Sequence, residues 1–281
     1  MKNVLIFGSG TMGTGIAQVL AEAGNQVWFC GRTEAKVQSC IDSIKKSLDK
    51  KVAGGKLEAA GPVMDRIKPT VNIEEAGKSV DFALESIVED LNTKNELFAK
   101  FDAFFPPETI FASNTSAISI TEMAARTQRI DRFLGLHFFN PVPVMNLVEV
   151  IKGLATSDAT MQAAKEFILS VGKTPVEVNE APGFIVNRML VPLTNEAAYI
   201  LADGVASAED IDTAMKLGAG HPMGPLALAD LIGLDVCVAV METLYRDFGD
   251  PKYRPCPLMR KMVQAGYLGR KTGRGFFTYS K

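Results

Sequence analysis

The sequence has 281 residues, which is long enough for two domains. Apolar residues make up 47% of it, and 30 basic side chains are balanced by 32 acidic ones. This balance excludes a general attraction to nucleic acid or to an acidic membrane, so any anionic ligand must be bound locally. The four cysteines show no C-x-x-C spacing, and no apolar run is long enough to span a membrane. We therefore expect a cytoplasmic protein with reduced thiols and without a signal peptide.

A glycine-rich stretch at the N-terminus has the clearest pattern. An apolar strand is predicted at residues 4–7, and Gly8, Gly10 and Gly13 follow it at G-x-G-x-x-G spacing. Apolar residues then recur at helical spacing up to Gly24, which is placed to end the helix. In such a loop the first glycine allows a tight turn, the second lets a pyrophosphate approach, and the third lets the helix pack on the strand. A dinucleotide-binding loop is therefore favoured over an ordinary glycine-rich turn.

Strands and helices alternate along the first 182 residues. Thr33 is placed to cap a long helix that ends at Gly54 and Gly55 and carries several lysines, whose default interpretation is a solvated helix face. The other predicted strands are 26–30, 69–73, 80–86, 109–112, 133–137, 147–151 and 175–178, and the other helices are 94–105 and 159–171. This alternation predicts an α/β fold with a mostly parallel sheet and helices on both faces.

After residue 182 the strand patterns disappear. Helices are predicted at 188–202, 208–217, 226–248 and 258–265. We therefore predict a dinucleotide-binding domain at 1–182 and a smaller all-α domain at 183–281. Its apolar content is high for a small bundle, and either a subunit interface or core packing accounts for Met189, Leu190, Leu228, Leu231, Ile232 and Val236. Of the two, we predict a subunit interface, and we therefore expect a homodimer joined through this domain.

The sequence contains two histidines, of which His137 is the better candidate for catalysis. It ends an apolar strand, and the carboxyl ends of strands in an open α/β sheet face the ligand crevice. Glu149 lies within the next apolar strand, where a buried carboxylate needs a partner and His137 is available. Such a pair would keep the imidazole ready for acid–base work. A Glu149 side chain that points to solvent on an edge strand is the equally weighted alternative. His221 lies in a Gly-Pro-rich turn and is interpreted as structural.

Ser113, Asn114, Thr115 and Ser116 also follow an apolar strand directly. Hydroxyl and amide groups at that place can bind a substrate carbonyl or a nicotinamide, or a Ser or Thr there can cap the next helix. A serine nucleophile is not indicated, because the sequence has no G-x-S-x-G elbow. Nor is a metal site, because no His, Cys and Asp cluster has ligand spacing.

Taken together, these residues resemble the 3-hydroxyacyl-CoA dehydrogenase family, in particular its short bacterial 3-hydroxybutyryl-CoA dehydrogenases. The resemblance covers the whole chain and includes the segments at 8–13, 113–116, 137–141, 181–184, 187–188, 221–225 and 269–271. It implies a Rossmann-type first domain, a helical dimerising second domain and NAD(P)-dependent hydride transfer at C3 of a 3-hydroxyacyl-CoA, such as (S)-3-hydroxybutyryl-CoA to acetoacetyl-CoA.

The resemblance also implies roles for single residues. His137 corresponds to the family's catalytic acid and base, Glu149 to its partner, Ser116 to the hydroxyl that binds the C3 oxygen, and Asn187 to an amide that positions substrate. The residues that match cofactor positions are Gly8, Gly10, Thr11, Met12, Gly13, Glu89, Lys94, Asn114, Ser116, Asn140 and Lys271. Ser47, Lys50 and Lys56 correspond to the arm that binds CoA.

The second predicted strand departs from the family pattern at its end. An acidic residue usually binds the ribose 2′-hydroxyl there, but this chain has Gly31, followed by Arg32 and Thr33. Gly31 removes a charge that would repel a 2′-phosphate and leaves room, while Arg32 suits a phosphate and Thr33 precedes a helix N-terminus. We therefore predict that NADP(H) is favoured over NAD(H). In the alternative, Arg32 stacks on the adenine and NAD still binds.

Two other functions remain as alternatives. One is a β-hydroxyacid dehydrogenase of similar two-domain shape, which would need a catalytic lysine in the second domain. The other is a sensor that binds a dinucleotide without turnover, and the presence of Ser116, His137, Glu149 and Asn187 together argues against it.

Overall fold

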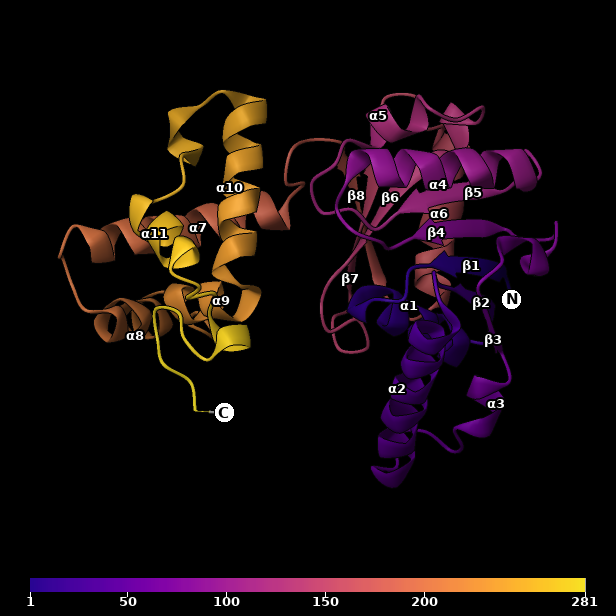
Figure 1. Cartoon of the computed structure of the whole chain (residues 1–281), viewed down its shortest axis with the longest axis horizontal. Coiled ribbons are helices and arrows are strands. Elements are labelled where there is room, and N and C mark those ends of the chain that lie inside the picture. Colours follow the sequence, from indigo (N-terminus) through magenta and orange to yellow (C-terminus); the bar gives the residue numbers. More distant parts are fainter. Residues whose placement is uncertain (281) are drawn as a thin grey trace. The chain divides into compact units, whose positions relative to one another are not determined.

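The computed structural model describes residues 1–280. Within it the chain forms two compact units, one of residues Met1–Ala181 and one that begins at Pro182 (Figure 1). The first unit contains the strands and the second is helical, as the sequence predicts.

The strands of the described chain form one eight-stranded sheet in the order β3-β2-β1-β4-β5-β6-β7-β8. They are β1 (Asn3–Phe7), β2 (Gln26–Cys30), β3 (Ile67–Thr70), β4 (Phe82–Glu85), β5 (Ile110–Ser113), β6 (Phe133–Phe138), β7 (Leu147–Lys152) and β8 (Thr174–Asn179). Every neighbouring pair is parallel except β6 and β7, which are antiparallel. The predicted fold class, a mostly parallel sheet followed by an all-α region, is confirmed.

Helices cover both faces of this sheet. They are α1 (Thr11–Glu22), α2 (Glu34–Ala53), α3 (Gly61–Met64), α4 (Leu91–Phe104), α5 (Ile120–Ala124) and α6 (Asp158–Ser170). Phe82 stacks on Phe167 of α6, whereas Phe111 and Phe133 contact Phe98 of α4. Because side chains alternate along a strand, the residues at 83 and 85 lie on the α4 side of the sheet with Phe111. That side carries the candidate site.

The second unit is built from α7 (Val186–Ala202), α8 (Ala208–Gly218), α9 (Pro225–Ile232), α10 (Leu234–Phe248) and α11 (Pro257–Gln264). Buried residues from several of these helices form one core, among them Leu226, Leu234, Met241 and Met259. The prediction of a single helix over residues 226–248 is wrong. Gly233 lies between α9 and α10 with φ of +106°, a backbone angle that glycine adopts without a steric penalty and that ends the first helix.

The prediction of a strand at residues 69–73 is also wrong in its position. The strand is β3, which pairs from Ile67 beside Val27 to Thr70 beside Cys30. It ends at Thr70 because the Asn72 side chain accepts a hydrogen bond from the Glu74 amide and starts a 3₁₀ helix at Ile73–Ala76. The short helices α3 and α5 escaped prediction because four or five residues carry too little periodicity.

Candidate active site

His137 and Glu149 face one another across the antiparallel pair of β6 and β7. The register places the two residues directly opposite, and His137 Nδ1 lies 2.7 Å from Glu149 Oε2. Glu149 is 1% exposed and His137 is 4% exposed. The alternative in which Glu149 points to solvent is therefore wrong. With Nδ1–H donating to the carboxylate, Nε2 is the ring nitrogen that can exchange a proton with a substrate.

Ser116 lies on the other side of the same imidazole. Its Oγ is 3.1 Å from His137 Nε2, so one hydroxyl and one carboxylate contact the two ring nitrogens. Ser116 belongs to the loop after β5, and β5 pairs in parallel with β6, which ends one residue after His137. Parallel strands end at the same edge of a sheet, and this brings the two residues together.

The rest of the segment 113–116 is fixed by hydrogen bonds inside the unit. Asn114 Oδ1 accepts from the Phe138 amide at 2.8 Å, which joins this loop to the strand of His137. Thr115 Oγ1 accepts from the Ile118 amide at 2.9 Å. The alternative that one of these residues caps the next helix is wrong, because α5 is capped by Ser119, whose Oγ accepts from the Glu122 amide.

Glu89 and Lys94 belong to an ion cluster in which Lys94 is buried and Glu89 is exposed. Glu89 Oε1 accepts from the Ser116 and Ala117 amides at 2.9 and 3.1 Å, and Glu89 Oε2 lies 3.3 Å from Lys94 Nζ. Lys94 is 1% exposed, and its Nζ lies 2.5 Å from Glu85 Oε1. The contacts of both residues are thus made within the unit, and their predicted place beside the cofactor remains a proposal.

Glu85 is the residue that the sequence reasoning missed. It is the last residue of β4, is completely buried, and accepts hydrogen bonds from Lys94, from the Ile87 amide and from the Ser113 hydroxyl. The signal that singled out Glu149, a carboxylate in an apolar strand, is equally present at Glu85 within the predicted strand 80–86.

The glycine-rich turn has the shape of a pyrophosphate site. Gly8 has φ of +146°, and a Cβ on it would lie 2.1 Å from the Ser86 carbonyl oxygen. A Cβ on Gly13 would lie 2.0 Å from the Gly8 oxygen. At Gly10, in contrast, no atom of the described chain beyond Gly10 and its two neighbours in sequence lies within 4 Å of where a Cβ would be. Gly10 caps the N-terminus of α1, whose first residues are Thr11 and Met12. This open helix N-terminus fits the phosphates of a dinucleotide.

The turn after β2 differs from the prediction in one respect. A Cβ on Gly31 would lie 2.7 Å from Val37 Cγ2 and 2.9 Å from the Ser9 side chain, so the space next to Gly31 is already filled. Gly31 thus leaves no room at its own α-carbon. Arg32 and Thr33 are exposed, and the Thr33 hydroxyl accepts from the Lys36 amide at the start of α2. An anionic ligand at this turn would therefore contact Arg32 and the first turn of α2, because there is no free space at Gly31 for it to enter.

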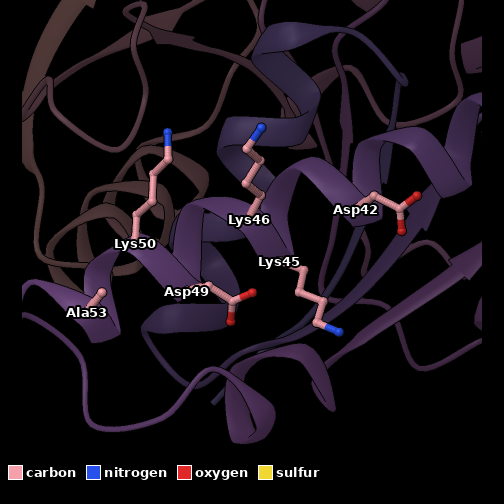
Figure 2. Close-up of a pocket in the computed structure, with 6 residues that line it drawn as sticks. All are labelled: Asp42, Lys45, Lys46, Asp49, Lys50 and Ala53. Atoms are coloured by element: carbon pink, nitrogen blue, oxygen red, sulfur yellow. The ribbon is translucent and has the colours of Figure 1, made fainter.

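The lysine-bearing helix α2 extends beyond the strands of the sheet (Figure 1). A solvent-open hollow of about 440 Å³ on it is lined by Asp42, Lys45, Lys46, Asp49, Lys50 and Ala53. Figure 2 shows Lys46 and Lys50 pointing to one side of the helix and Lys45 to the other. Lys51 is paired with Glu22 at 2.7 Å. Of the three predicted CoA contacts, Lys50 lines this hollow and Ser47 and Lys56 lie outside its lining.

The remaining predicted contacts lie after β6 and in the second unit. Asn140 is exposed. Asn187 lies in the first turn of α7 and is half-buried. Lys271 Nζ pairs with Asp235 at 2.6 Å. His221 is half-buried in its turn, where its amide donates to the Met215 carbonyl. The roles of Asn140, Asn187 and Lys271 toward ligands remain predictions.

The predicted interface residues of the second unit are largely accessible. Met189 is 73% exposed, Leu231 is 50% exposed and Val236 is 44% exposed, while Leu190, Leu228 and Ile232 are half-buried. Side chains that only filled the core would be buried, so core packing alone does not account for the exposed members of this set.

Other catalytic groups find little support in residues 1–280. Burial raises the pKa of Cys30 and of Cys237 to about 12, so neither thiol ionises near neutral pH. In the described part of the chain, no three His, Cys, Asp or Glu side chains are grouped to bind a metal ion. No helix within it is long and apolar enough to cross a membrane.

Comparison with known proteins identifies the family of the chain. The NAD-binding domain of 3-hydroxyacyl-CoA dehydrogenase matches residues 3–181, and the C-terminal domain of the same enzyme matches residues 183–279. The chain is 50% identical over 278 residues to 3-hydroxybutyryl-CoA dehydrogenase of Clostridioides difficile, covering 98% of this chain and 99% of that one. It is 45% identical over 287 residues to the mitochondrial hydroxyacyl-coenzyme A dehydrogenase of Homo sapiens, covering 99% and 91%.

A solved structure is similar over the full length. The crystal structure of (S)-3-hydroxybutyryl-CoA dehydrogenase PaaH1 from Ralstonia eutropha superposes with a TM-score of 0.97 at 49% identity and covers 100% of both chains. With both family domains matched in order and the His137–Glu149 pair in place, the chain belongs to the 3-hydroxyacyl-CoA dehydrogenase family of nicotinamide-dependent oxidoreductases.

Proposed function

We propose that this enzyme interconverts (S)-3-hydroxybutyryl-CoA and acetoacetyl-CoA, with His137 as the acid and base. The observation that carries the proposal is the line of contacts from Ser116 Oγ to His137 Nε2 and from His137 Nδ1 to Glu149. Both full-length bacterial relatives described above bear the name of this activity. The alternative of a β-hydroxyacid dehydrogenase with a lysine base gains no support from a site in which a histidine is already paired.

The residues divide the reaction between them. When bound, the nicotinamide cofactor accepts or supplies the hydride at C3. In the oxidative direction neutral His137 takes the C3 hydroxyl proton at Nε2, and Glu149 stabilises the positive charge that forms on the ring. In the reductive direction the imidazolium returns that proton to the C3 oxygen. Ser116 donates a hydrogen bond to the same oxygen, and Asn187 helps to position the substrate.

The cofactor and substrate contacts follow from the same proposal. We assign the dinucleotide to residues 1–182, at the glycine-rich turn and near Glu89, Lys94, Asn114 and Asn140. We also assign Lys271 to cofactor binding. Residues 183–281 form the substrate and dimerisation domain. Arg32 at the N-terminus of α2 supports a preference for NADP(H) over NAD(H). Lys50, Ser47 and Lys56 contact CoA, and the enzyme works in the cytoplasm without nucleic acid or membrane.

A spectrophotometric assay tests the activity. Purified enzyme with acetoacetyl-CoA and reduced cofactor should consume the cofactor, and a series of longer 3-ketoacyl-CoA substrates then measures its preference for acyl chain length. Enzyme that turns over none of these thioesters while it binds the cofactor would overturn the proposal.

The dimer is tested separately. The exposed apolar side chains Met189, Leu231 and Val236 predict a homodimer through the helical domain. Light scattering at micromolar concentration should give twice the chain mass of 30.3 kDa. A monomer would contradict it.

A further inference from the structure

Glu85 is a buried carboxylate that the proposed mechanism does not use. It ends β4, where β4 lies between β1 and β5, and the register places it beside Phe7 and Ser113. A fully buried carboxylate is stable only when donors satisfy it, and Glu85 has three. The role of Glu85 therefore depends on which segments its three donors belong to.

Each donor to Glu85 belongs to a segment next to the reaction centre. Ser113 Oγ, at 2.7 Å, begins the loop that carries Ser116, and the same oxygen accepts from the Thr115 amide. The Ile87 amide, at 2.7 Å, belongs to the loop that carries Glu89. Lys94 Nζ, at 2.5 Å, joins Glu85 to Glu89. One carboxylate therefore fixes both strand-end loops and the lysine between them.

The chain of contacts ends at the catalytic histidine. Glu89 accepts from the Ser116 amide at 2.9 Å, and Ser116 Oγ lies 3.1 Å from His137 Nε2. We infer that Glu85, acting with Lys94, is a positioning residue that sets the Ser116 hydroxyl at its distance from His137 and from the C3 oxygen. This inference rests on the proposed function for the role of Ser116.

Kinetics of Glu85→Gln test the inference. Glutamine has the same shape but no charge, so it weakens the contact with Lys94 and places an NH₂ group against one donor. We expect kcat to fall by about 10²-fold, as for a misplaced reacting group, with little change in KM. In a Ser116→Ala background the same change should lower kcat by less than about threefold, because the hydroxyl to be positioned is gone. An equal loss in both backgrounds would overturn the inference.

Asp102→Asn is the matched control. Asp102 lies near the far end of α4 and forms a similar ion pair with Arg129 at 2.7 Å. This variant should lose stability to a similar extent but keep kcat. A comparable loss of kcat in Asp102→Asn would show that general destabilisation explains the result.

A measurement without turnover separates this inference from the proposed function. The chain has two histidines, so ¹⁵N-histidine NMR reports His137 beside His221 as an internal reference. In Glu85→Gln the His137 Nε2 signal should move toward its position in Ser116→Ala, and in Asp102→Asn it should stay. An unmoved Nε2 signal in Glu85→Gln would overturn the positioning role even if the enzyme acts on acetoacetyl-CoA as proposed. A moved signal without thioester turnover would support the contact and reject the function.

Discussion

The strand ends around His137 and the outer surface formed by Arg32 and α2 differ in how firmly their charges are fixed. His137, Glu149, Glu85 and Lys94 are almost completely buried, and each makes short contacts with other side chains. Arg32, in contrast, is exposed. Removing one partner of a buried charge pair leaves an uncompensated charge, whereas an exposed ion pair contributes only about 0–1 kcal/mol. The buried part therefore fixes the chemistry, and the exposed part can change its ligand preference without disturbing the fold.

The strongest test of this difference is His137→Gln. Glutamine cannot exchange the proton, so turnover should fall by about 10²–10⁴-fold, the usual range for the loss of a general acid or base. Cofactor affinity, measured by fluorescence titration, should be nearly unchanged. The control is His221→Gln, which changes the other histidine in the second unit and should keep its turnover. A His137 variant with parental turnover would refute the proposed mechanism.

Glu149→Gln should have the next largest effect. The amide preserves the size of the side chain but removes the charge that stabilises the imidazolium. We expect kcat to fall by about 10–10²-fold, which corresponds to roughly 1.4–2.7 kcal/mol of lost transition-state stabilisation. Cofactor affinity should change less than kcat. Glu177→Gln on the neighbouring strand β8 is the control, because Glu177 is part of an exposed pair with Lys165. Equal losses in kcat and cofactor affinity would argue against a role for Glu149 in proton transfer.

The same contrast explains how far the sequence predicted the molecule. The pattern of apolar strands led to the sheet, because buried strands are marked by their apolar residues. It left a Glu149 paired with His137 and a Glu149 that points to solvent equally weighted, and only the resemblance to the family favoured the pair. The helix break at Gly233 was missed, because apolar residues continue on both sides of it and only the backbone angle ends the helix. The filled space at Gly31 depends on Val37 and Ser9, which a motif does not bring together. Glu85 could have been found by the argument already applied to Glu149.

Substitutions at the exposed turn of Gly31 and Arg32 should have an intermediate effect, which is a change in the preference between NADPH and NADH. The parent should have a higher kcat/KM with NADPH than with NADH, and Gly31→Asp combined with Arg32→Ile should shift the ratio toward NADH. The carboxylate repels a 2′-phosphate, and the loss of Arg32 removes its partner.

Gly31→Ala is the matched control for that pair, because its Cβ meets Val37 and Ser9 without adding charge. It separates the steric effect of any side chain at this position from the electrostatic effect of aspartate. The prediction fails if the parent prefers NADH by tenfold or more, which is about 1.4 kcal/mol.

The smallest effect is expected on α2. Lys46 and Lys50 point to one side of the helix and Lys45 to the other (Figure 2), so a phosphate of CoA on one side would contact the first two. Lys50→Ala should raise KM for acetoacetyl-CoA by up to about fivefold, because an exposed charge pair is worth at most about 1 kcal/mol. The effect should shrink as salt is added, since screening weakens exposed charges. Lys45→Ala is the matched control on the same helix and should leave KM unchanged. Equal effects of the two substitutions would show that α2 binds CoA only through its total charge. No single lysine of this exposed surface would then have a fixed role, in contrast to the buried residues around His137.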